Sequence, residues 1–305
     1  MLNEKKVIVR IAEGLGNQLF MYANALAIAK SNNATLYVDD ESAFFKKKNK
    51  QRFREYNLDI FNSYISICKS HNKFNTYPKD IVRKFLKIID LFRSEKLFLI
   101  DNTSNHSLFY DKLTNLNFKN TLYIEGHFES EKYFSFLESD LKSSLTINNE
   151  LIKIDNKLIN SIKNSNSISI HIRRHRFSEE MNKNHRENNV KSEEFTRSII
   201  KYVYRSVSFF KNNVENPKFF IWSNDFSDLD IHFDKKNFTF IKGNDIATDF
   251  YLFSLCKHFI VGPSTFHWWG AWLNNNANKI CLRPDEEFLN PSNNKSFWPK
   301  NWLKY

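Results

Sequence analysis

The chain has 305 residues, more than a typical single domain and fewer than three domains would need, so two domains are expected. Hydrophobic residues make up 41% of it and include 30 phenylalanines, which excludes a largely disordered chain. A net charge of +11 favours phosphate-bearing partners, whether nucleotide, lipid or nucleic acid.

The cysteines and the apolar stretches indicate a compartment. Cys68, Cys256 and Cys281 are far apart and odd in number, so neither a disulfide framework nor a CxxC metal site is expected. No stretch approaches the roughly 18 apolar residues of a membrane span. We therefore expect a cytoplasmic protein, with a weak peripheral contact to the anionic inner face of a membrane through the basic stretches 46–54 and 79–97.

The first half of the chain predicts an α/β domain over 1–150. A strand at 7–11, a turn at 13–17, a helix at 18–30 and a strand at 35–39 form a βαβ unit. The polar, weakly periodic stretch near 40–120 is expected to be a long insertion with an apolar helical segment at 81–92. A strand at 122–126 and helical spacing over 130–145 complete this half.

The second half, 151–305, predicts another α/β series. Strand and helix alternate in both halves, so we expect a fold of two Rossmann-like, doubly wound domains facing a cleft. In the second half the expected strands are 168–172, 219–222, 238–241 and 259–262, and the expected helices are 193–211, 249–256 and 265–274.

Glycine is scarce, with only 6 residues, so the ones present should have specific roles. Gly14 and Gly16 follow the first strand and open a helix, where a ligand can approach the backbone. Many such turns need glycine for geometry alone, and the third glycine of a dinucleotide fingerprint is missing. The pair is therefore weak evidence by itself.

His171, Arg173 and Arg174 lie at the carboxyl end of the strand expected at 168–172. Ligands of open α/β sheets bind at that end. Two arginines there can offer forked donors to a pyrophosphate. The alternatives are that both arginines are surface charges and that His171 is a packed structural histidine.

Ser264 and Thr265 follow the strand expected at 259–262 and open a helix, an arrangement that suits an anion. The same helix carries three tryptophans. We expect at least two of them to be core residues, since positions i and i+4 share a helix face. The tryptophans are Trp268, Trp269 and Trp272.

Taken together, these segments resemble the bacterial α-1,2-fucosyltransferases of glycosyltransferase family 11. VRIAEGLGNQLFMYA at 9–23 is similar to the family's VRLxGGLGNQMFQYA, and EGHFESEKY at 125–133 to its EGYFQSEKYF. FIWSND at 220–225 is similar to FFIFSDD, and 249–273 to DMYLMSLCKHxIxANSTFSWWGAWL. HIRR at 171–174 is similar to the start of HxRRGDY, which α-1,6- and protein O-fucosyltransferases share.

The resemblance implies a GT-B fold, GDP-β-L-fucose as donor, no metal or other cofactor, and inversion to an α-linked product. It implies transfer to O2 of a galactoside acceptor during synthesis of a surface glycan such as O-antigen, capsule or lipooligosaccharide. The first domain would hold the acceptor and the second the GDP, with Arg173 and Arg174 on the phosphates, and with Arg174 as the catalytic arginine. Asp249 would lie near guanine or ribose, and Ser264 and Thr265 would donate to the β-phosphate. The full set of expected donor-binding residues is Gly14, Gly16, Asn17, His171, Arg173, Arg174, Ser223, Asp225, Asp249, Ser264, Thr265 and Phe266.

An inverting transfer also needs a base for the acceptor proton. Glu13, Asp39 and Glu125 lie at strand ends of the first domain and could serve, although a structural role is the stronger expectation for each. Of the three, Glu13 is the one that we assign as a candidate catalytic residue.

Three residues depart from the family pattern. Glu13 stands at the family's first glycine, and His175 and Arg176 replace the Gly-Asp that follows its arginine pair. A cation at 176 should repel Arg173 and Arg174 unless an acid such as Glu179 or Glu180 compensates, so we expect a rearranged loop and a changed donor or acceptor preference.

Three other functions stay open from sequence. The first is transfer of another GDP-linked deoxy sugar such as a 6-deoxyheptose. The second is a catalytically inactive sugar-binding relative. The third is an RNA-binding protein, but the aromatics occupy apolar runs and no RNP or KH pattern appears, so we expect no nucleic-acid partner.

Overall fold

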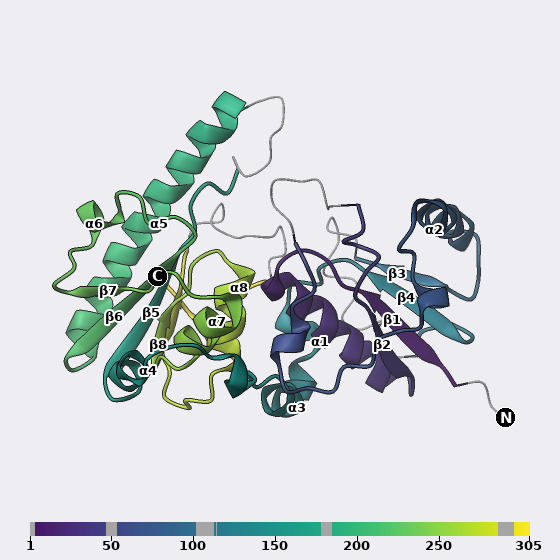
Figure 1. The fold of residues 1–305 in the computed structure, drawn as a ribbon, viewed down its shortest axis with the longest axis horizontal. Coiled ribbons are helices and arrows are strands. Elements are labelled where there is room, and N and C mark those ends of the chain that lie inside the picture. Colours follow the sequence, from purple (N-terminus) through teal and green to yellow (C-terminus); the bar gives the residue numbers. More distant parts are fainter. Residues whose placement is uncertain (1–3, 47–53, 102–112, 114, 178–184, 286–295) are drawn as a thin grey trace. The chain divides into compact units, whose positions relative to one another are not determined.

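The computed structural model describes residues 4–46, 54–101, 113, 115–177, 185–285 and 296–305. The chain divides into two compact units: unit 1 is Met1–Thr146 with Ser292–Phe297, and unit 2 is Ile147–Pro291 with Trp298–Tyr305. Each unit has its own parallel sheet with helices packed on it (Figure 1). The predicted class, α/β with two Rossmann-like domains, is confirmed.

Unit 1 is built on a four-stranded sheet of order β2-β1-β4-β3, in which every neighbouring pair is parallel. The strand order reverses between β1 and β4, because the chain first moves from β1 to β2 and later returns to the other side. The strands are β1 (Lys6–Arg10), β2 (Thr35–Asp39), β3 (Phe98–Ile100) and β4 (Thr121–Glu125).

The helix after β1, α1 (Leu15–Ser31), starts three residues earlier than the sequence predicts. Gly14 is its N-cap with extended backbone (φ −84°, ψ 167°), so the turn is shorter than expected. Leu19, Phe20 and Ala23 are fully buried, and the helix is apolar almost all round, as a helix inside a domain should be.

The stretch expected as an insertion also supplies part of the domain itself, since β3 is an edge strand of the sheet. It contains α2 (Tyr77–Asp90), with Pro78 in the first turn where a missing N–H costs nothing. The helical spacing over 130–145 does not form one helix, because it breaks into short 3₁₀ turns before the last segment. The remaining elements are η1 (Leu58–Ile60), η2 (Ser70–Asn72), η5 (Glu131–Tyr133), η6 (Ser135–Leu137) and α3 (Glu138–Ser144).

Unit 2 has a six-stranded parallel sheet of order β10-β9-β8-β5-β6-β7, of which Figure 1 labels β5 to β8. Counted from β5, this is the order of a doubly wound dinucleotide-binding sheet, with its reversal between β5 and β8. The sequence did not predict β9, β10 or the helix before β5. The strands are β5 (Asn166–Ile172), β6 (Pro217–Ser223), β7 (Phe238–Phe240), β8 (His258–Ile260), β9 (Cys281–Arg283) and β10 (Leu303–Lys304).

The core of unit 2 forms where Ile168, Ile170 and Ile172 of β5 pack against buried residues such as Phe195 and Ile199. The prediction for the tryptophans is confirmed, because two of the three in the last helix are fully buried and the third is 4% exposed. The helices of this unit are α4 (Asn156–Lys163), α5 (His185–Asn213), α6 (Leu229–His232), α7 (Ile246–Ser254) and α8 (Thr265–Leu273), with one 3₁₀ turn, η7 (Asn149–Leu151).

Candidate functional site

The carboxyl ends of β5 and β8 form the switch point of the unit 2 sheet, the place where open α/β sheets bind ligands. Arg173 and Arg174 follow β5 directly, and Gly262 and Ser264 follow β8. A Cβ on Gly262 would lie 2.3 Å from the carbonyl oxygen of His171, so a larger residue would push the two strand ends apart. The two predicted arginines thus lie at the switch point of the unit 2 sheet.

Arg174 is held in place by unit 2 itself. Its Nη1 lies 3.3 Å from Oδ2 of Asp225 and also donates to the carbonyl oxygen of Ser227. Its backbone N–H donates to Oδ1 of Asn224 over 2.7 Å, and Nδ2 of Asn224 donates back to its carbonyl oxygen over 3.0 Å. With a side chain only 17% exposed, Arg174 has little rotamer freedom left to lose when a ligand arrives.

His175 occupies a left-handed backbone conformation with φ of 58°, which explains why a glycine suits this position in the resembling family. Its Nε2 pairs with Oδ2 of Asp225 at 2.7 Å. This bond, together with donation from the backbone and hydroxyl of Ser227, holds the pKa of Asp225 well below its ordinary value. Asp225 is therefore an ionised anchor for the side chains of Arg174 and His175.

Arg176 packs on aromatic rings. Its guanidinium carbon lies 5.2 Å from the ring centre of Phe195 and 5.7 Å from that of Phe177, a geometry of cation–π contacts. Glu179 and Glu180, named from the sequence as compensating acids, lie outside the described residues. The acid that pairs with Arg174 and His175 is Asp225, which lies fifty positions after His175 in the sequence.

On the β8 side of the switch point, Ser264 is the N-cap of α8 and has an extended backbone. Its side chain accepts no hydrogen bond from the helix. Thr265 begins the helix. The ring of Phe266 packs against Phe250 and Phe253, with centroids 5.4 Å and 5.0 Å away. The start of α8 therefore combines oriented N–H groups with a Phe266 side chain that is packed against two neighbouring aromatic rings.

The other predicted donor residues of unit 2 are tied into the same strand ends. The hydroxyl of Ser223 lies 2.8 Å from the carbonyl oxygen of Ile172 and so links β6 to β5. Asp249 accepts from Nε1 of Trp222 at 3.2 Å and from Nδ2 of Asn244 at 2.9 Å, and burial raises the pKa of its carboxyl.

Behind the arginines, two histidines form a neutral pair. The ring of His171 lies 5.5 Å from the fully buried ring of His267, whose Nε2 is 2.6 Å from the hydroxyl of Ser169. Burial, and secondarily the charge of Arg173, lowers the pKa of His171 to about 3. At neutral pH the imidazole adds no charge of its own.

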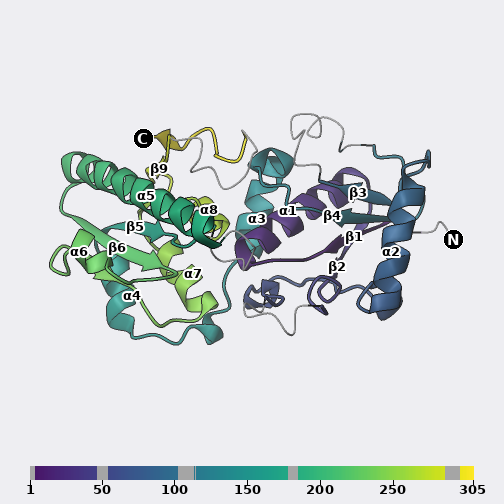
Figure 2. The same cartoon turned by 90° about the horizontal axis from the view of Figure 1, so that it is seen from above.

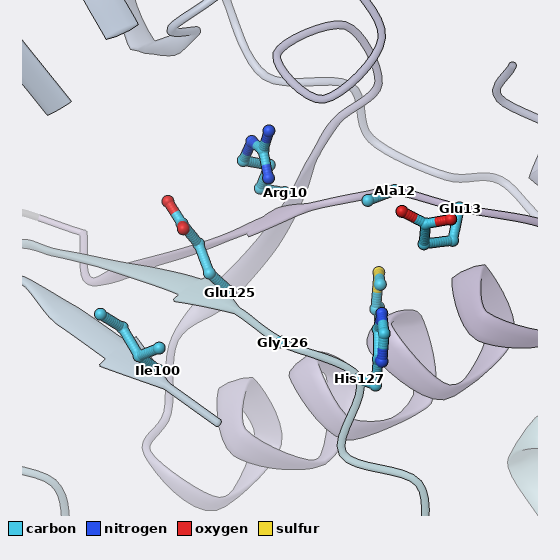
Figure 3. Close-up of a pocket in the computed structure, with 8 residues that line it drawn as sticks. Arg10, Ala12, Glu13, Ile100, Glu125, Gly126 and His127 are labelled. Carbon is cyan, nitrogen blue, oxygen red and sulfur yellow. The ribbon is translucent and has the colours of Figure 1, made fainter. Parts of the chain in front are cut away.

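Unit 1 has its own hollow at the corresponding place, a cavity of about 290 Å³ at the carboxyl ends of β1, β4 and β3. Figure 3 shows how the side chains after β1 and β4 border it. The cavity lies at the switch point of the unit 1 sheet, between β1 and β4. Its lining includes Arg10, Ala12, Glu13, Ile100, Glu125, Gly126 and His127.

Two of the three acids considered as a base are committed to other contacts. Asp39 is 1% exposed and accepts from the backbone N–H groups of Glu41 and Ser42. Glu125 receives Arg83 at 2.7 Å on both oxygens and Lys87 at 2.5 Å. Burial raises the pKa of Glu125, but these cations outweigh it and keep the pKa below its ordinary value. The third acid, Glu13, lines the cavity, and its role as a base stays a prediction.

Sequence reasoning missed His127, which also lines this cavity. Its side chain is 43% exposed, and its Nδ1 lies 3.9 Å from the carboxylate of the largely buried Glu129. The available signal was its place directly after a strand end, where the family pattern carries tyrosine. Glu13, like His175, has a left-handed backbone (φ 64°) at a family glycine.

The described structure divides the predicted donor residues between the units. Gly14, Gly16 and Asn17 lie at the start of α1 in unit 1, whereas the residues from His171 onward lie in unit 2. The unit 2 residues gather at one sheet edge. A role in donor binding stays a prediction for all of them.

Two parallel α/β units, each with a switch point between its central strands, have the architecture of the GT-B fold. The sequence matches the model of Glycosyl transferase family 11 over residues 6–305. The chain belongs to that family, and family membership favours an enzyme over the RNA-binding alternative.

Relatives agree with this assignment. An alpha-1,2-colitosyltransferase of Escherichia coli is 30% identical over 307 residues, with 98% of each chain covered. The O-antigen biosynthesis glycosyltransferase WbnK of Escherichia coli is 27% identical over 303 residues, covering 94% of this chain and 95% of the relative. The fold is similar to that of fucosyltransferase NodZ from Bradyrhizobium, with a TM-score of 0.54, 15% identity, and 88% and 92% of the two chains covered. A NodZ crystal soaked with GDP-fucose gives a TM-score of 0.52.

Proposed function

We propose that this chain transfers a 6-deoxy-L-hexose, with L-fucose as the first choice, from a GDP donor to O2 of a galactoside during surface-glycan synthesis. The product is the α-linked sugar, formed with inversion. The observation that carries this proposal is the pair of arginines at the switch point of unit 2, with Arg174 already fixed by Asp225 and the Ser227 carbonyl.

The reaction needs a site for a leaving group that gains charge. As the bond between the sugar and the β-phosphate breaks, negative charge grows on GDP, and fixed guanidinium groups stabilise it. Arg173 and Arg174 are assigned to the phosphates, and the N-terminus of α8 with Ser264 and Thr265 to the β-phosphate. Family membership supports this assignment, since the motifs that contain these residues lie within the matched range.

The similarity to a colitosyltransferase and to a fucosyltransferase supports two closely similar candidates for the donor sugar. Colitose is L-fucose without its 3-hydroxyl, so the two sugars would fit one pocket and differ by a single hydrogen bond. A site that hydrogen-bonds this hydroxyl would reject colitose strongly, whereas an apolar site would discriminate only weakly. A 6-deoxyheptose is the third donor to test, because His175 and Arg176 depart from the family pattern.

We assign the acceptor to the cavity of unit 1, and the acceptor proton to Glu13. The cavity mixes a cation, carboxylates and an imidazole, which suits a neutral sugar with many hydroxyls better than a phosphate. Glu13 lines it from the turn that follows β1, where its carboxylate can reach an acceptor hydroxyl bound in the cavity. His127 is the second group of the cavity able to take a proton.

The deciding experiment is a donor panel. The protein is incubated with GDP-L-fucose, GDP-colitose or a GDP-6-deoxyheptose and a set of galactosides, in the presence of a chelator, and the products are analysed by mass and linkage. We expect a fucosyl product linked α-1,2 without added metal. A larger rate with GDP-colitose would reassign the donor, and GDP binding without any product would favour the inactive sugar-binding relative.

A further inference from the structure

The orientation of α2 is the reverse of that expected for a surface helix. Its apolar side faces outward: Phe85 is 61% exposed, Ile81 66% and Ile88 59%, and the chain just after the helix exposes Leu91 to 74% and Phe92 to 87%. In both Figure 1 and Figure 2, α2 stands at the outer edge of unit 1 beside the sheet, and no described helix or strand of the unit lies over its outer side. Tyr77 and Val82 extend the same surface.

Its charged side faces inward and is fixed there by ion pairs. Arg83, 9% exposed, donates to both Asp80 and Glu125. Lys87 reaches the same Glu125 at the end of β4, and Asp90 accepts from the backbone N–H groups before and within β3. Turning the helix over would leave these buried charges unpaired, which costs several kcal/mol in a protein interior. The apolar side is therefore held outward.

The charges around the apolar side are mainly positive. From Tyr77 to Lys96 the acids are Asp80 and Asp90, which are buried, and Glu95, which is exposed. Exposed cations flank the apolar residues: Lys84, with a side chain 64% exposed, and Arg93 and Lys96 beyond the end of the helix. Apolar residues bordered by lysine and arginine are the pattern of helices that lie in the interface of an anionic bilayer.

We propose that the outer face of α2, made of Tyr77, Ile81, Phe85, Ile88, Leu91 and Phe92 with its flanking cations, docks on an anionic lipid bilayer. The phenylalanines enter the boundary between headgroups and acyl chains, and the cations contact lipid phosphates. A second copy of the chain fits this face less well, because it would bring like charges together. No helix in the described part of the chain is long and apolar enough to span a bilayer, so this contact is a peripheral one.

This surface stands apart from the proposed transfer reaction. It connects to the acceptor cavity through Glu125, which lines the cavity and binds Arg83 and Lys87 of α2. Docking can be measured without donor or acceptor, so it can fail while the transferase proposal stands, and the reverse also holds.

The test is flotation of the full chain with vesicles of phosphatidylcholine alone or with about one third phosphatidylglycerol, the anionic lipid supplying the charge. We expect binding to the anionic vesicles only, weakened by salt. Phe85→Ser with Phe92→Ser should lower the partition coefficient about tenfold or more. Lys84→Gln should lower it about fivefold.

Matched controls lie in unit 2. Ile231→Ser removes an apolar residue that is 78% exposed on α6, and Lys235→Gln removes an exposed lysine that pairs loosely with Asp230, as Lys84 does with Asp80. Neither control should change vesicle binding. Thermal unfolding of each variant checks that it is folded.

A direct probe is also available, because all three native cysteines are buried. A cysteine introduced by Phe92→Cys can carry an environment-sensitive fluorophore, whose emission should shift to the blue with anionic vesicles and be quenched by lipid-borne quenchers. A probe that stays in water while the protein is bound would overturn the proposal. So would equal binding by the two-phenylalanine variant, or a concentration-dependent dimer that Phe85→Ser abolishes.

Discussion

The two sheets of this protein place very different chemistry at equivalent positions. Each has a switch point at the carboxyl ends of its central strands: β1 and β4 in unit 1, β5 and β8 in unit 2. Unit 2 gathers two arginines there, and the ionised Asp225 anchors Arg174. Unit 1 instead has an open cavity bordered by Glu13 and His127, and its Glu125 is paired with Arg83 and Lys87. In the reaction that we propose, the same topology serves an anionic leaving group in unit 2 and a neutral hydroxyl in unit 1, because the residues after the strands differ.

The largest expected effect is at the arginine pair on the switch point of unit 2. Arg174→Lys should lower kcat/KM, with a loss of about 2–4 kcal/mol of transition-state stabilisation. The reason is that an ammonium group cannot bind a phosphate and at the same time reach Asp225 and the Ser227 carbonyl. Steady-state kinetics with GDP-fucose measure it, with Arg205→Lys on the exposed side of α5 as the matched control. An unchanged kcat/KM would show that Arg174 is only a surface charge. The contrast between the switch points of unit 1 and unit 2 would then have no catalytic meaning.

The next largest effect is at the cavity of unit 1. Glu13→Gln should lower kcat about a hundredfold while GDP affinity stays the same, because the base acts in unit 1 and the nucleotide is assigned to unit 2. Titration of GDP by calorimetry and single-turnover kinetics separate these two effects. Glu138→Gln on α3 is the control. If His127→Gln is the more damaging variant, the proton goes to the imidazole and our assignment of Glu13 is wrong.

A third change returns the loop after β5 to the family pattern. His175→Gly with Arg176→Asp removes the imidazole on Asp225 and the guanidinium on Phe195, so we expect the preference between GDP-fucose and its alternatives to change about tenfold. Competition between two GDP-sugars measures that ratio directly. Equal ratios for the native chain and the variant would show that the departure is neutral.

The smallest effect concerns stability. Glu13→Gly removes a side chain from a left-handed backbone, so we expect the free energy of unfolding to rise by about 1 kcal/mol while activity is lost. Denaturant titration measures the first and the fucose-transfer assay the second. Asn216→Gly, at φ of 46°, is a control that should stabilise without loss of activity. Equal activity of both variants would place the acceptor base elsewhere.

Much of the fold follows from local sequence. The isoleucines of β5 and the apolar runs of β1, β4 and β6 predict buried parallel strands, since such strands are covered on both faces and read as continuous apolar stretches. The strands β3, β9 and β10 have two or three residues each and were not predicted. Segments this short have no period to detect, and their pairing depends on the neighbouring strand.

The sequence by itself determined which residues follow each central strand, and therefore that arginines and serines would meet at one edge of the second sheet. The tertiary structure alone decided their partners. His175 finds Asp225 fifty positions later, and Arg83 finds Glu125 forty-two positions later. The sequence of α2 shows an apolar face and a charged face. The charged face points inward because Arg83 and Lys87 pair with Glu125 at the end of β4. Local periodicity carries no information on such distant partners, and so the outward apolar face of α2 became visible only in the folded chain.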